Sequence, residues 1–365
     1  MRAVAVHPSA RSVDVVEVAE PGPVAGDGVL ARVLEVGICG TDREIAAFEY
    51  GTPPDGEERL VIGHEALAEV VDAGAVVAGV RPGDLVVPMV RRPCGRPGCR
   101  PCAEGRQDYC ATGEYRERGI KGCHGYMTEL IADAERYMVP VAPELRDVAV
   151  LTEPLTIAEK ALEQLLAIQR RLPWSPEGST AVVIGAGPVG LLGAMALRIR
   201  GFRTVVYSRS RPPDARAALA EAIGAEYVSS EDVPPRDLPG LLGGPVDVVY
   251  EAAGVARLAF DALSVLGPNG VLVLTGVPAP EPPREEDVAA MMRRLVLGNQ
   301  VVAGTVNAGR SSYQTAASSL LEFDRRWPGP LRALITGRHP LEEAPGLLTR
   351  RGGGIKEVVA VAREG

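Results

Sequence analysis

The segment that most constrains the fold is a glycine-rich turn near the middle of the chain. Gly185-Ala186-Gly187-Pro188-Val189-Gly190 fits the pattern GxGxxG. It follows a β-branched run at 181–184 and opens a helical pattern at 190–200, and that setting makes the match specific. The pattern permits a tight turn, backbone approach to a pyrophosphate and close helix–strand packing. We therefore predict cofactor binding by Gly185, Gly187, Pro188, Val189 and Gly190; the alternative is a glycine-rich turn without a ligand.

Strand and helix patterns alternate on both sides of this turn. β-branched runs at 181–184, 204–207, 246–250, 271–274 and 301–303 are interspersed with helical patterns at 190–200 and 214–223. The alternation predicts an α/β fold, with a doubly wound parallel sheet of the Rossmann type over residues 179–307. Beyond about Asn307 we expect no further alternation of that kind.

The first 150 residues have a different pattern. They contain short β-branched runs at 3–6, 13–18, 29–36 and 85–90, bounded by glycine and proline turns. A helix is expected over 155–172, where Pro173 ends it. The length of 365 residues suits two domains. We expect a catalytic domain from residues 1–178 and 308–365, with the Rossmann domain inserted between them.

The end of the second expected Rossmann strand bears on cofactor choice. NAD sites usually carry a carboxylate there for the ribose hydroxyls. This chain instead has Tyr207-Ser208-Arg209-Ser210-Arg211. Because guanidinium groups bind phosphate well, we predict that Ser208, Arg209 and Arg211 bind the 2′-phosphate of NADP and that NAD binds more weakly. The alternative is a solvated arginine pair.

Four of the six cysteines lie close together, at Cys94, Cys99, Cys102 and Cys110. Their spacing, C-x4-C-x2-C-x7-C, suits a closed tetrahedral zinc site whose role is structural. Two disulfides, inert thiols or an iron–sulfur cluster are the alternatives. The start of the chain lacks the apolar core of a signal peptide, so we expect a cytoplasmic protein with reduced thiols.

Charge and hydropathy exclude several classes of partner. The formal net charge is -8 and no basic block occurs, which argues against binding to nucleic acid or to an anionic membrane. The uncharged stretch 178–197 is long enough to span a bilayer, but it contains the glycine-rich turn and divides into a strand and a helix. We expect no membrane span.

Two further residues suit a catalytic metal. Cys39 lies in Gly37-Ile38-Cys39-Gly40-Thr41-Asp42, and His64 lies in Gly63-His64-Glu65-Ala66. A lone cysteine or histidine more often serves packing, but a dinucleotide site and a cysteine cluster in one chain favour a metal. A dehydrogenase zinc needs three protein ligands and an open fourth position, and Cys39 and His64 supply two of the ligands.

Together these residues resemble the zinc-dependent medium-chain dehydrogenases/reductases and, within them, the NADP-preferring glucose 1-dehydrogenases of archaea and bacteria. The similarity spans nearly the whole chain and rests on the segments 37–42, 63–65, 91–94, 105–110, 153–155 and 305–308. It implies a GroES-like, distorted β-barrel catalytic domain and two zinc ions per chain, one catalytic and one structural. It also implies a homodimer or homotetramer.

The resemblance further implies roles for individual residues. Glu153 would be the third ligand of the catalytic zinc. Glu65 would be a further ligand, or a carboxylate that orients His64 without touching the metal. Glu114 and Asn307 would face a polyhydroxylated substrate, and Asn307 would also lie near the nicotinamide.

The implied reaction oxidises a sugar hydroxyl and transfers hydride to NADP; for an aldose, oxidation at C1 gives a lactone. The zinc would lower the pKa of the hydroxyl, and Thr41 would pass the proton outward unless its hydroxyl bonds only to nearby backbone. Met89-Val90 precedes Arg91 where a polar residue is expected. A polyol, an aminocyclitol or another sugar-like intermediate is therefore the alternative substrate. The remote alternative is an NADPH-binding protein without catalysis.

Overall fold

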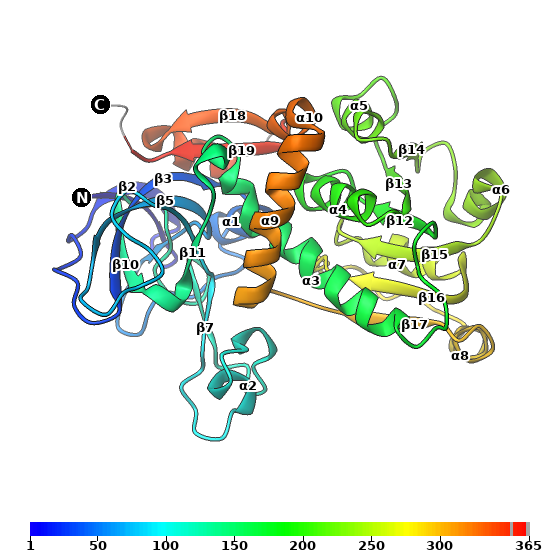
Figure 1. Cartoon of the computed structure of the whole chain (residues 1–365), viewed down its shortest axis with the longest axis horizontal. Coiled ribbons are helices and arrows are strands. Elements are labelled where there is room, and N and C mark those ends of the chain that lie inside the picture. Colours follow the sequence, from blue (N-terminus) through cyan, green and yellow to red (C-terminus); the bar gives the residue numbers. More distant parts are fainter. Residues whose placement is uncertain (351–352, 363–365) are drawn as a thin grey trace. The chain divides into compact units, whose positions relative to one another are not determined.

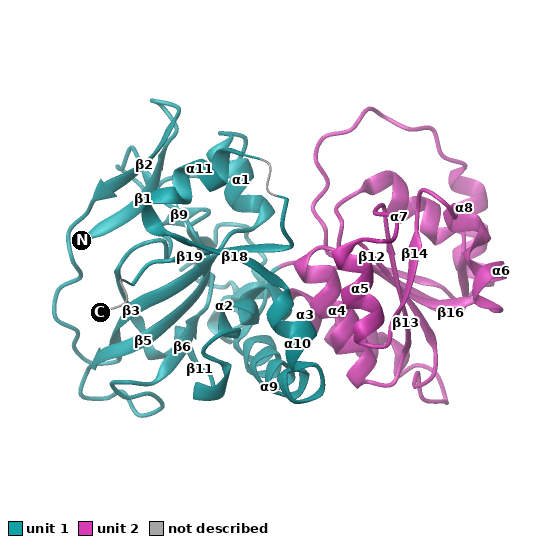
Figure 2. Ribbon diagram, turned by 90° about the horizontal axis from the view of Figure 1, so that it is seen from above, with its two compact units in different colours: residues 1–156, 307–365 teal, residues 157–306 magenta. Residues whose placement is uncertain are grey.

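The computed structural model describes residues 1–350 and 353–362, and its contacts divide the chain into two compact units (Figure 2). Unit 1 comprises residues 1–156 and 307–365, and unit 2 comprises residues 157–306. The sequence suggests the boundaries 178/179 and 307/308 for its two domains. Helix α3 (Thr152–Gln169) crosses the first contact boundary, so most of this helix belongs to unit 2.

Unit 2 is built on a six-stranded parallel sheet in the order β14-β13-β12-β15-β16-β17. Counted from β12, this is the 3-2-1-4-5-6 order of a doubly wound dinucleotide fold, and it confirms the predicted α/β class. The strands are β12 (Thr180–Ile184), β13 (Arg203–Ser208), β14 (Glu226–Ser229), β15 (Val246–Glu251), β16 (Leu266–Leu274) and β17 (Val301–Gly304). The helices are α4 (Pro188–Ile199), α5 (Ala215–Ala222), α6 (Leu238–Leu242), α7 (Ala256–Leu263) and α8 (Val288–Leu297).

The glycine-rich turn joins β12 to α4 as predicted. Gly185 has a φ of 107°, a left-handed conformation that favours glycine. A Cβ at Gly190 would lie 2.0 Å from the carbonyl oxygen of Gly185, so only glycine allows the helix to pack this close. Helix α4 begins at Pro188, two residues earlier than the pattern suggests, because proline is well suited to the first turn of a helix.

The described residues of unit 1 form two three-stranded sheets and one mixed seven-stranded sheet. Their orders are β2-β1-β4, then β11-β6-β5-β3-β19-β18 with β10 paired to β3, and β7-β8-β9. The strands are β1 (Arg2–His7), β2 (Ser12–Glu17), β3 (Gly28–Gly37), β4 (Leu60–Val61), β5 (Glu65–Ala73), β6 (Leu85–Pro88), β7 (Arg91–Arg92), β8 (Arg116–Arg118), β9 (Gly122–Cys123), β10 (Leu130–Ala134), β11 (Met138–Pro140), β18 (Ile335–Pro340) and β19 (Lys356–Ala360). The helices are α1 (Gly40–Ala46), α2 (Arg100–Ala103), α9 (Arg310–Arg326), α10 (Pro328–Ala333) and α11 (Ala344–Thr349). In Figure 1 the loop with α2 stands away from the larger sheets.

Two expectations from the sequence are wrong. Strand–helix alternation does not end near Asn307, since β18 and β19 pair in parallel with α11 between them. Strand β18 has no fully buried residue, so it lacks the apolar run that would indicate it. Helix α3 begins at Thr152 and ends at Gln169 rather than spanning 155–172, because Pro154 fits within the first turn.

The apolar interior of unit 1 lies between its largest sheet and the segments around it. Val4, Val33, Ala68 and Val86 are fully buried there. Val359 of β19 joins the same cluster, so the C-terminal strand completes a core that begins near the N-terminus. Among the described residues, no helix combines the length and the apolar character needed to cross a bilayer.

Candidate functional site

Cys39, His64 and Glu65 form one cluster at the adjoining ends of two strands. Cys39 follows β3 and caps the N-terminus of α1, where its thiol accepts a hydrogen bond from the backbone N–H of Thr41 at 3.4 Å. His64 directly precedes β5, and Glu65 begins it opposite Gly37 of β3. One donor atom from each of the three side chains lies within 4.8 Å of the other two. The antiparallel register therefore brings together residues that lie 25 positions apart.

Asp42 supports this cluster, a role that the sequence did not indicate. Its Oδ1 lies 3.2 Å from Nδ1 of His64, and its Oδ2 accepts a hydrogen bond from the Cys39 backbone at 2.9 Å. This contact leaves Nε2 of His64 for a metal. Burial lowers the pKa of His64, but the negative charges of Asp42 and Cys39 outweigh it and raise the pKa well above its usual value.

Glu153 lies beside this cluster in the first turn of α3. Burial raises its pKa to about 8; the neighbouring His64 opposes that change, and the Glu65 carboxylate reinforces it. A carboxylate buried to this degree is stable as an anion only beside a compensating positive charge. The thiol of Cys39, the imidazole of His64 and the carboxylate of Glu65 are donors that zinc accepts, so these three residues fit the predicted metal. Glu153 does not belong to this group of close donors, and its predicted place as a ligand stays a prediction.

Lys356 of β19 makes a buried ion pair with Oε2 of Glu65 and donates a hydrogen bond to the carbonyl oxygen of Ile38 at 2.9 Å. The sequence did not indicate a role for this lysine, because it lies 291 positions from its partner in a strand that the pattern did not predict. The predicted proton relay through Thr41 stays a prediction.

The four clustered cysteines form a second group of metal donors. One sulfur atom from each of Cys94, Cys99, Cys102 and Cys110 lies within 4.8 Å of the others. All are free thiols, and the sulfur atoms of Cys99 and Cys110 are 4.0 Å apart, about twice a disulfide bond length. Burial raises the pKa of Cys110, but hydrogen bonds from Thr112 and Gly113 outweigh it and lower the pKa to about 6. This arrangement suits four-thiolate zinc coordination rather than two disulfides.

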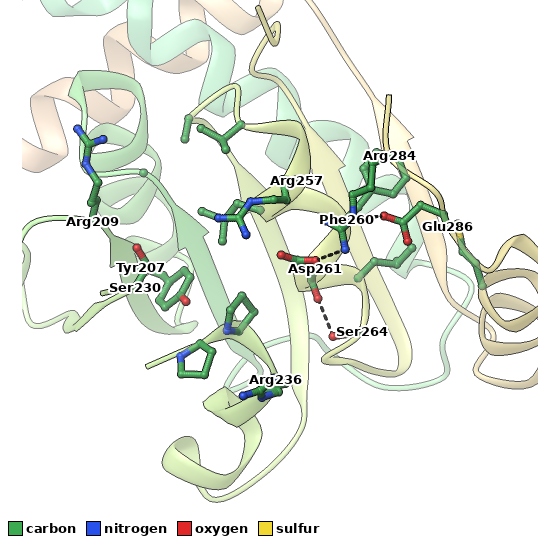
Figure 3. Close-up of a pocket in the computed structure, with 18 of the residues that line it drawn as sticks. Tyr207, Arg209, Ser230, Arg236, Arg257, Phe260, Asp261, Ser264, Arg284 and Glu286 are labelled. Atoms are coloured by element: carbon green, nitrogen blue, oxygen red, sulfur yellow. Dashed lines mark hydrogen bonds and ion pairs between the residues drawn. The ribbon is translucent and has the colours of Figure 1, made fainter. Parts of the chain in front are cut away.

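A cavity of about 960 Å³ opens in unit 2 beside the ends of the central strands. Gly185, Ser208 and Arg209 line it, as the predicted cofactor site requires. Figure 3 shows Arg209 near Tyr207 and Ser230, with Arg257 closer to the middle of the cavity. Arg257 lies in the first turn of α7, and nothing in the local sequence indicated that it would line this cavity.

Arg211 does not line this cavity. Its guanidinium pairs with Oδ1 of Asp232 at 2.7 Å and donates to the carbonyl oxygen of Glu231 at 3.2 Å. Of the two arginines predicted to bind a 2′-phosphate, only Arg209 therefore faces the cavity.

Asn307 contacts Glu117, not Glu114. Its Nδ2 donates to Oε1 of Glu117 at 3.0 Å, and Arg91 donates to the same oxygen at 2.9 Å. Glu117 is buried, whereas Glu114 is half exposed and pairs with Arg96 at the surface. The structure thus joins Asn307 to Glu117, a carboxylate that the sequence did not single out, and the predicted role of Glu114 stays a prediction.

Two family models match most of the chain. The model described as alcohol dehydrogenase GroES-like domain matches residues 25–143. The model described as glucose dehydrogenase C-terminus matches residues 146–361. Together they cover both units.

Individual relatives agree with these matches. Glucose 1-dehydrogenase of Thermoproteus tenax is 43% identical over 348 residues, which cover 94% of each chain. Glucose 1-dehydrogenase of Methanocella arvoryzae is 40% identical over 344 residues, again 94% of each chain. The solved structure of Haloferax mediterranei glucose dehydrogenase in complex with NADP, Zn and gluconolactone is 34% identical, covers 100% of both chains and has a TM-score of 0.90.

Proposed function

The chain belongs to the glucose dehydrogenases of the zinc-dependent medium-chain dehydrogenase family, and on that premise we propose that it oxidises C1 of a glucose-like aldose to the lactone with NADP as hydride acceptor. The observation that carries this proposal is the full-length similarity to the Haloferax enzyme, whose structure holds NADP, Zn and gluconolactone. We assign catalysis to unit 1 and dinucleotide binding to unit 2.

The catalytic zinc would be held by Cys39, His64 and Glu153, with Glu65 beside it. When bound, zinc supplies Lewis acidity that lowers the pKa of a substrate hydroxyl. Asp42 fixes the imidazole of His64 through Nδ1. We assign to Thr41 the passage of the hydroxyl proton to solvent, since it lies next to the site and is partly exposed. The four-cysteine group would hold the second, structural zinc.

We assign recognition of sugar hydroxyls to Glu117 and Asn307 rather than to Glu114. Glu117 is held by Arg91, whose guanidinium also stacks on Tyr115 at 3.6 Å. A carboxylate fixed in this way can accept a hydrogen bond from a hydroxyl without paying the entropy of becoming ordered. Asn307 offers an amide beside it, in a backbone conformation with a φ of 58°.

We assign binding of the NADP 2′-phosphate to Ser208 and Arg209, with Gly185 close to the pyrophosphate. No carboxylate occurs between Tyr207 and Arg211 to accept the ribose hydroxyls of NAD. NAD is therefore expected to be the weaker cofactor.

The exposed surface of unit 2 and the free thiols support proposals for assembly and location. Helix α8 exposes Val288, Met292, Val296 and Leu297, and the edge strand β17 exposes Val302. Apolar side chains gathered in this way favour burial against a second copy, which supports a homodimer or homotetramer. Four free thiols that converge on one position suit a reducing compartment such as the cytoplasm.

The test is NADPH formation across a panel of aldoses, polyols and amino sugars. We expect the highest kcat/KM with glucose or a close epimer, and a lactone as product. Met89 is a buried, apolar residue at a position before Arg91 where a polar residue is expected. The second candidate function is therefore a dehydrogenase of another sugar-like alcohol. Turnover of polyols or aminocyclitols without turnover of aldoses would favour that second candidate and contradict the first.

A further inference from the structure

The cavity of unit 2 is lined by more positive side chains than its ion pairs use. Among the described residues, five arginines line it, at positions 209, 236, 257, 284 and 294. Arg284 pairs with Asp261 at 2.8 Å and with Glu286 at 2.7 Å. Arg236 lies 3.8 Å from Asp237. Within the described part of the chain, the guanidinium groups of the other three arginines make no hydrogen bond or ion pair.

The backbone that carries Arg257 is held in place by a buried carboxylate. Glu251 ends β15 and is 2% exposed, and its Oε1 accepts hydrogen bonds from the N–H groups of Ala253 at 2.8 Å and Gly254 at 2.7 Å. Its Oε2 accepts another from the N–H of Gly276 at 3.2 Å. Gly254 has a φ of 66°, a conformation that glycine adopts easily. Helix α7 therefore begins at a fixed place, with Arg257 in its first turn.

The segment before α7 also touches the glycine-rich turn. A Cβ on Gly185 would lie 3.1 Å from the Cβ of Ala253, and both residues line the cavity. In Figure 3 the side chain of Arg257 runs from α7 toward the middle of the cavity, on the side where Arg209 and Tyr207 lie. Arg209 follows the end of β13. Two guanidinium groups carried by separate elements therefore face the same space.

The charge of the expected ligand calls for more than one cation. A phosphate monoester carries about 1.5 to 2 negative charges at pH 7, so Arg209 alone does not neutralise it. Arg211 is paired with Asp232 at 2.7 Å and does not line the cavity. Of the remaining cations, Arg294 lies in the last turn of α8, whereas Arg257 follows the segment that touches the glycine-rich turn.

We propose that Arg257 is a second guanidinium, beside Arg209, that binds the 2′-phosphate of NADP and so helps to determine the preference for NADP over NAD. Guanidinium groups form paired, charge-assisted hydrogen bonds with phosphate. NAD carries a hydroxyl in place of this phosphate, so it gains little from the same side chain. The inference rests on the proposed use of NADP and adds a residue of α7 to the segments that the sequence assigned to cofactor binding.

The test is calorimetric binding of 2′,5′-ADP and 5′-AMP to the full-length protein, since these fragments differ only in the 2′-phosphate. Arg257→Ala should weaken the binding of 2′,5′-ADP by roughly ten- to a hundredfold and leave that of 5′-AMP nearly unchanged. Arg294→Ala is the matched control, because it removes another arginine from the cavity lining, and it should bind both fragments as wild type does. Arg257 is exposed, and retained binding of 5′-AMP would show that its variant is folded.

Three results would overturn the inference. Equal weakening of both fragments in Arg257→Ala would mean that the arginine contacts the adenine, ribose or 5′-phosphate that they share. Unchanged binding of 2′,5′-ADP would mean that it contacts neither fragment. An equal loss in Arg294→Ala would show that only the overall charge of the cavity matters. Wild-type protein that binds 5′-AMP as tightly as 2′,5′-ADP would instead refute the proposed preference for NADP itself.

Discussion

Asn307 and Glu117 are joined by a hydrogen bond of 3.0 Å, although 190 positions separate them in the chain. The bond links the start of the returning C-terminal segment to strand β8 of the same unit. It places an amide and a buried carboxylate side by side, and Arg91 donates to the same carboxylate oxygen. This pair, rather than the exposed Glu114, therefore forms the polar group to which we assign sugar recognition.

Replacing Glu117 should impair sugar use without impairing cofactor binding. Loss of one hydrogen bond to a charged group costs about 1.5–3 kcal/mol, so Glu117→Gln should lower kcat/KM for the sugar by roughly ten- to a hundredfold. The KM for NADP should not change. Glu114→Gln is the matched control and should behave as wild type; a larger effect in the control than in Glu117→Gln would contradict the assignment.

Arg209 and Arg211 should differ in their effect on NADP. Arg209 faces the cavity, whereas Arg211 is engaged by Asp232. Arg209→Ala should raise the KM for NADP by roughly ten- to a hundredfold and leave the KM for NAD nearly unchanged. Arg211→Ala should have a much smaller effect. Steady-state kinetics of both variants with NADP and with NAD would measure these effects. Equal effects of the two variants would show that the cavity lining does not determine the preference for NADP over NAD.

The four-cysteine group should stabilise the fold rather than take part in turnover. Binding of zinc to such sites contributes on the order of 10 kcal/mol to folding. Cys102→Ser should therefore lower the zinc content from two ions towards one per chain and lower Tm. Cys123→Ser, which changes a thiol outside the group, is the control and should retain both ions. Metal analysis alongside thermal unfolding would reveal the difference, and a Cys102→Ser protein with both ions bound would refute the site.

Asp133 should make the free energy of unfolding depend on pH under acidic conditions. Burial raises its pKa, but the guanidinium groups of Arg118 and Arg92 outweigh this and lower the pKa below its usual value. A carboxyl whose pKa is lower in the folded state contributes stability above its unfolded pKa and loses that contribution as the pH falls through the folded pKa. The contribution should therefore be complete at neutral pH, begin to fall below about pH 4 and be lost as the pH passes the lower pKa of the folded state.

The variant Asp133→Asn tests this dependence. It leaves the buried guanidinium of Arg92 and the partly buried guanidinium of Arg118 without their shared carboxylate. The loss should cost about 3–5 kcal/mol at pH 7 and less in acid. Asp27→Asn removes an exposed partner of Arg136 and should cost no more than about 1 kcal/mol. Urea unfolding at several pH values measures both. A penalty for Asp133→Asn that stayed constant down to pH 2 would rule out the ionised carboxylate as its cause.

Local patterns in the sequence predicted the glycine-rich turn and the four-cysteine group, because each depends on residues that are close together in the chain. The turn from Gly185 to Gly190 has a conformation that glycine alone adopts easily, and its neighbours identify it as a strand-to-helix junction. The spacing of the four cysteines needs only a short loop to bring them together. The residues that determine the structure span six positions in the turn and 17 positions in the cysteine group.

The features that the sequence did not reveal depend on distant pairing. Glu114 and Glu117 lie three positions apart, and only the placement of β8 makes one buried and the other exposed. Lys356 reaches Glu65 because β19 pairs with β3, whose end also pairs with the start of β5. Strand β18 has Ile335 as its one aliphatic side chain and buries no residue fully, so its pairing with β19 gave no apolar signal.

The central claim is that Cys39, His64 and Glu153 hold a zinc ion. The most direct measurement is anomalous diffraction at the zinc absorption edge from crystals of the zinc-loaded protein. We predict two peaks per chain, one at the four cysteines and one about 2.0–2.3 Å from the donor atoms of Cys39, His64 and Glu153. Absence of the second peak from zinc-loaded, active protein would contradict the account.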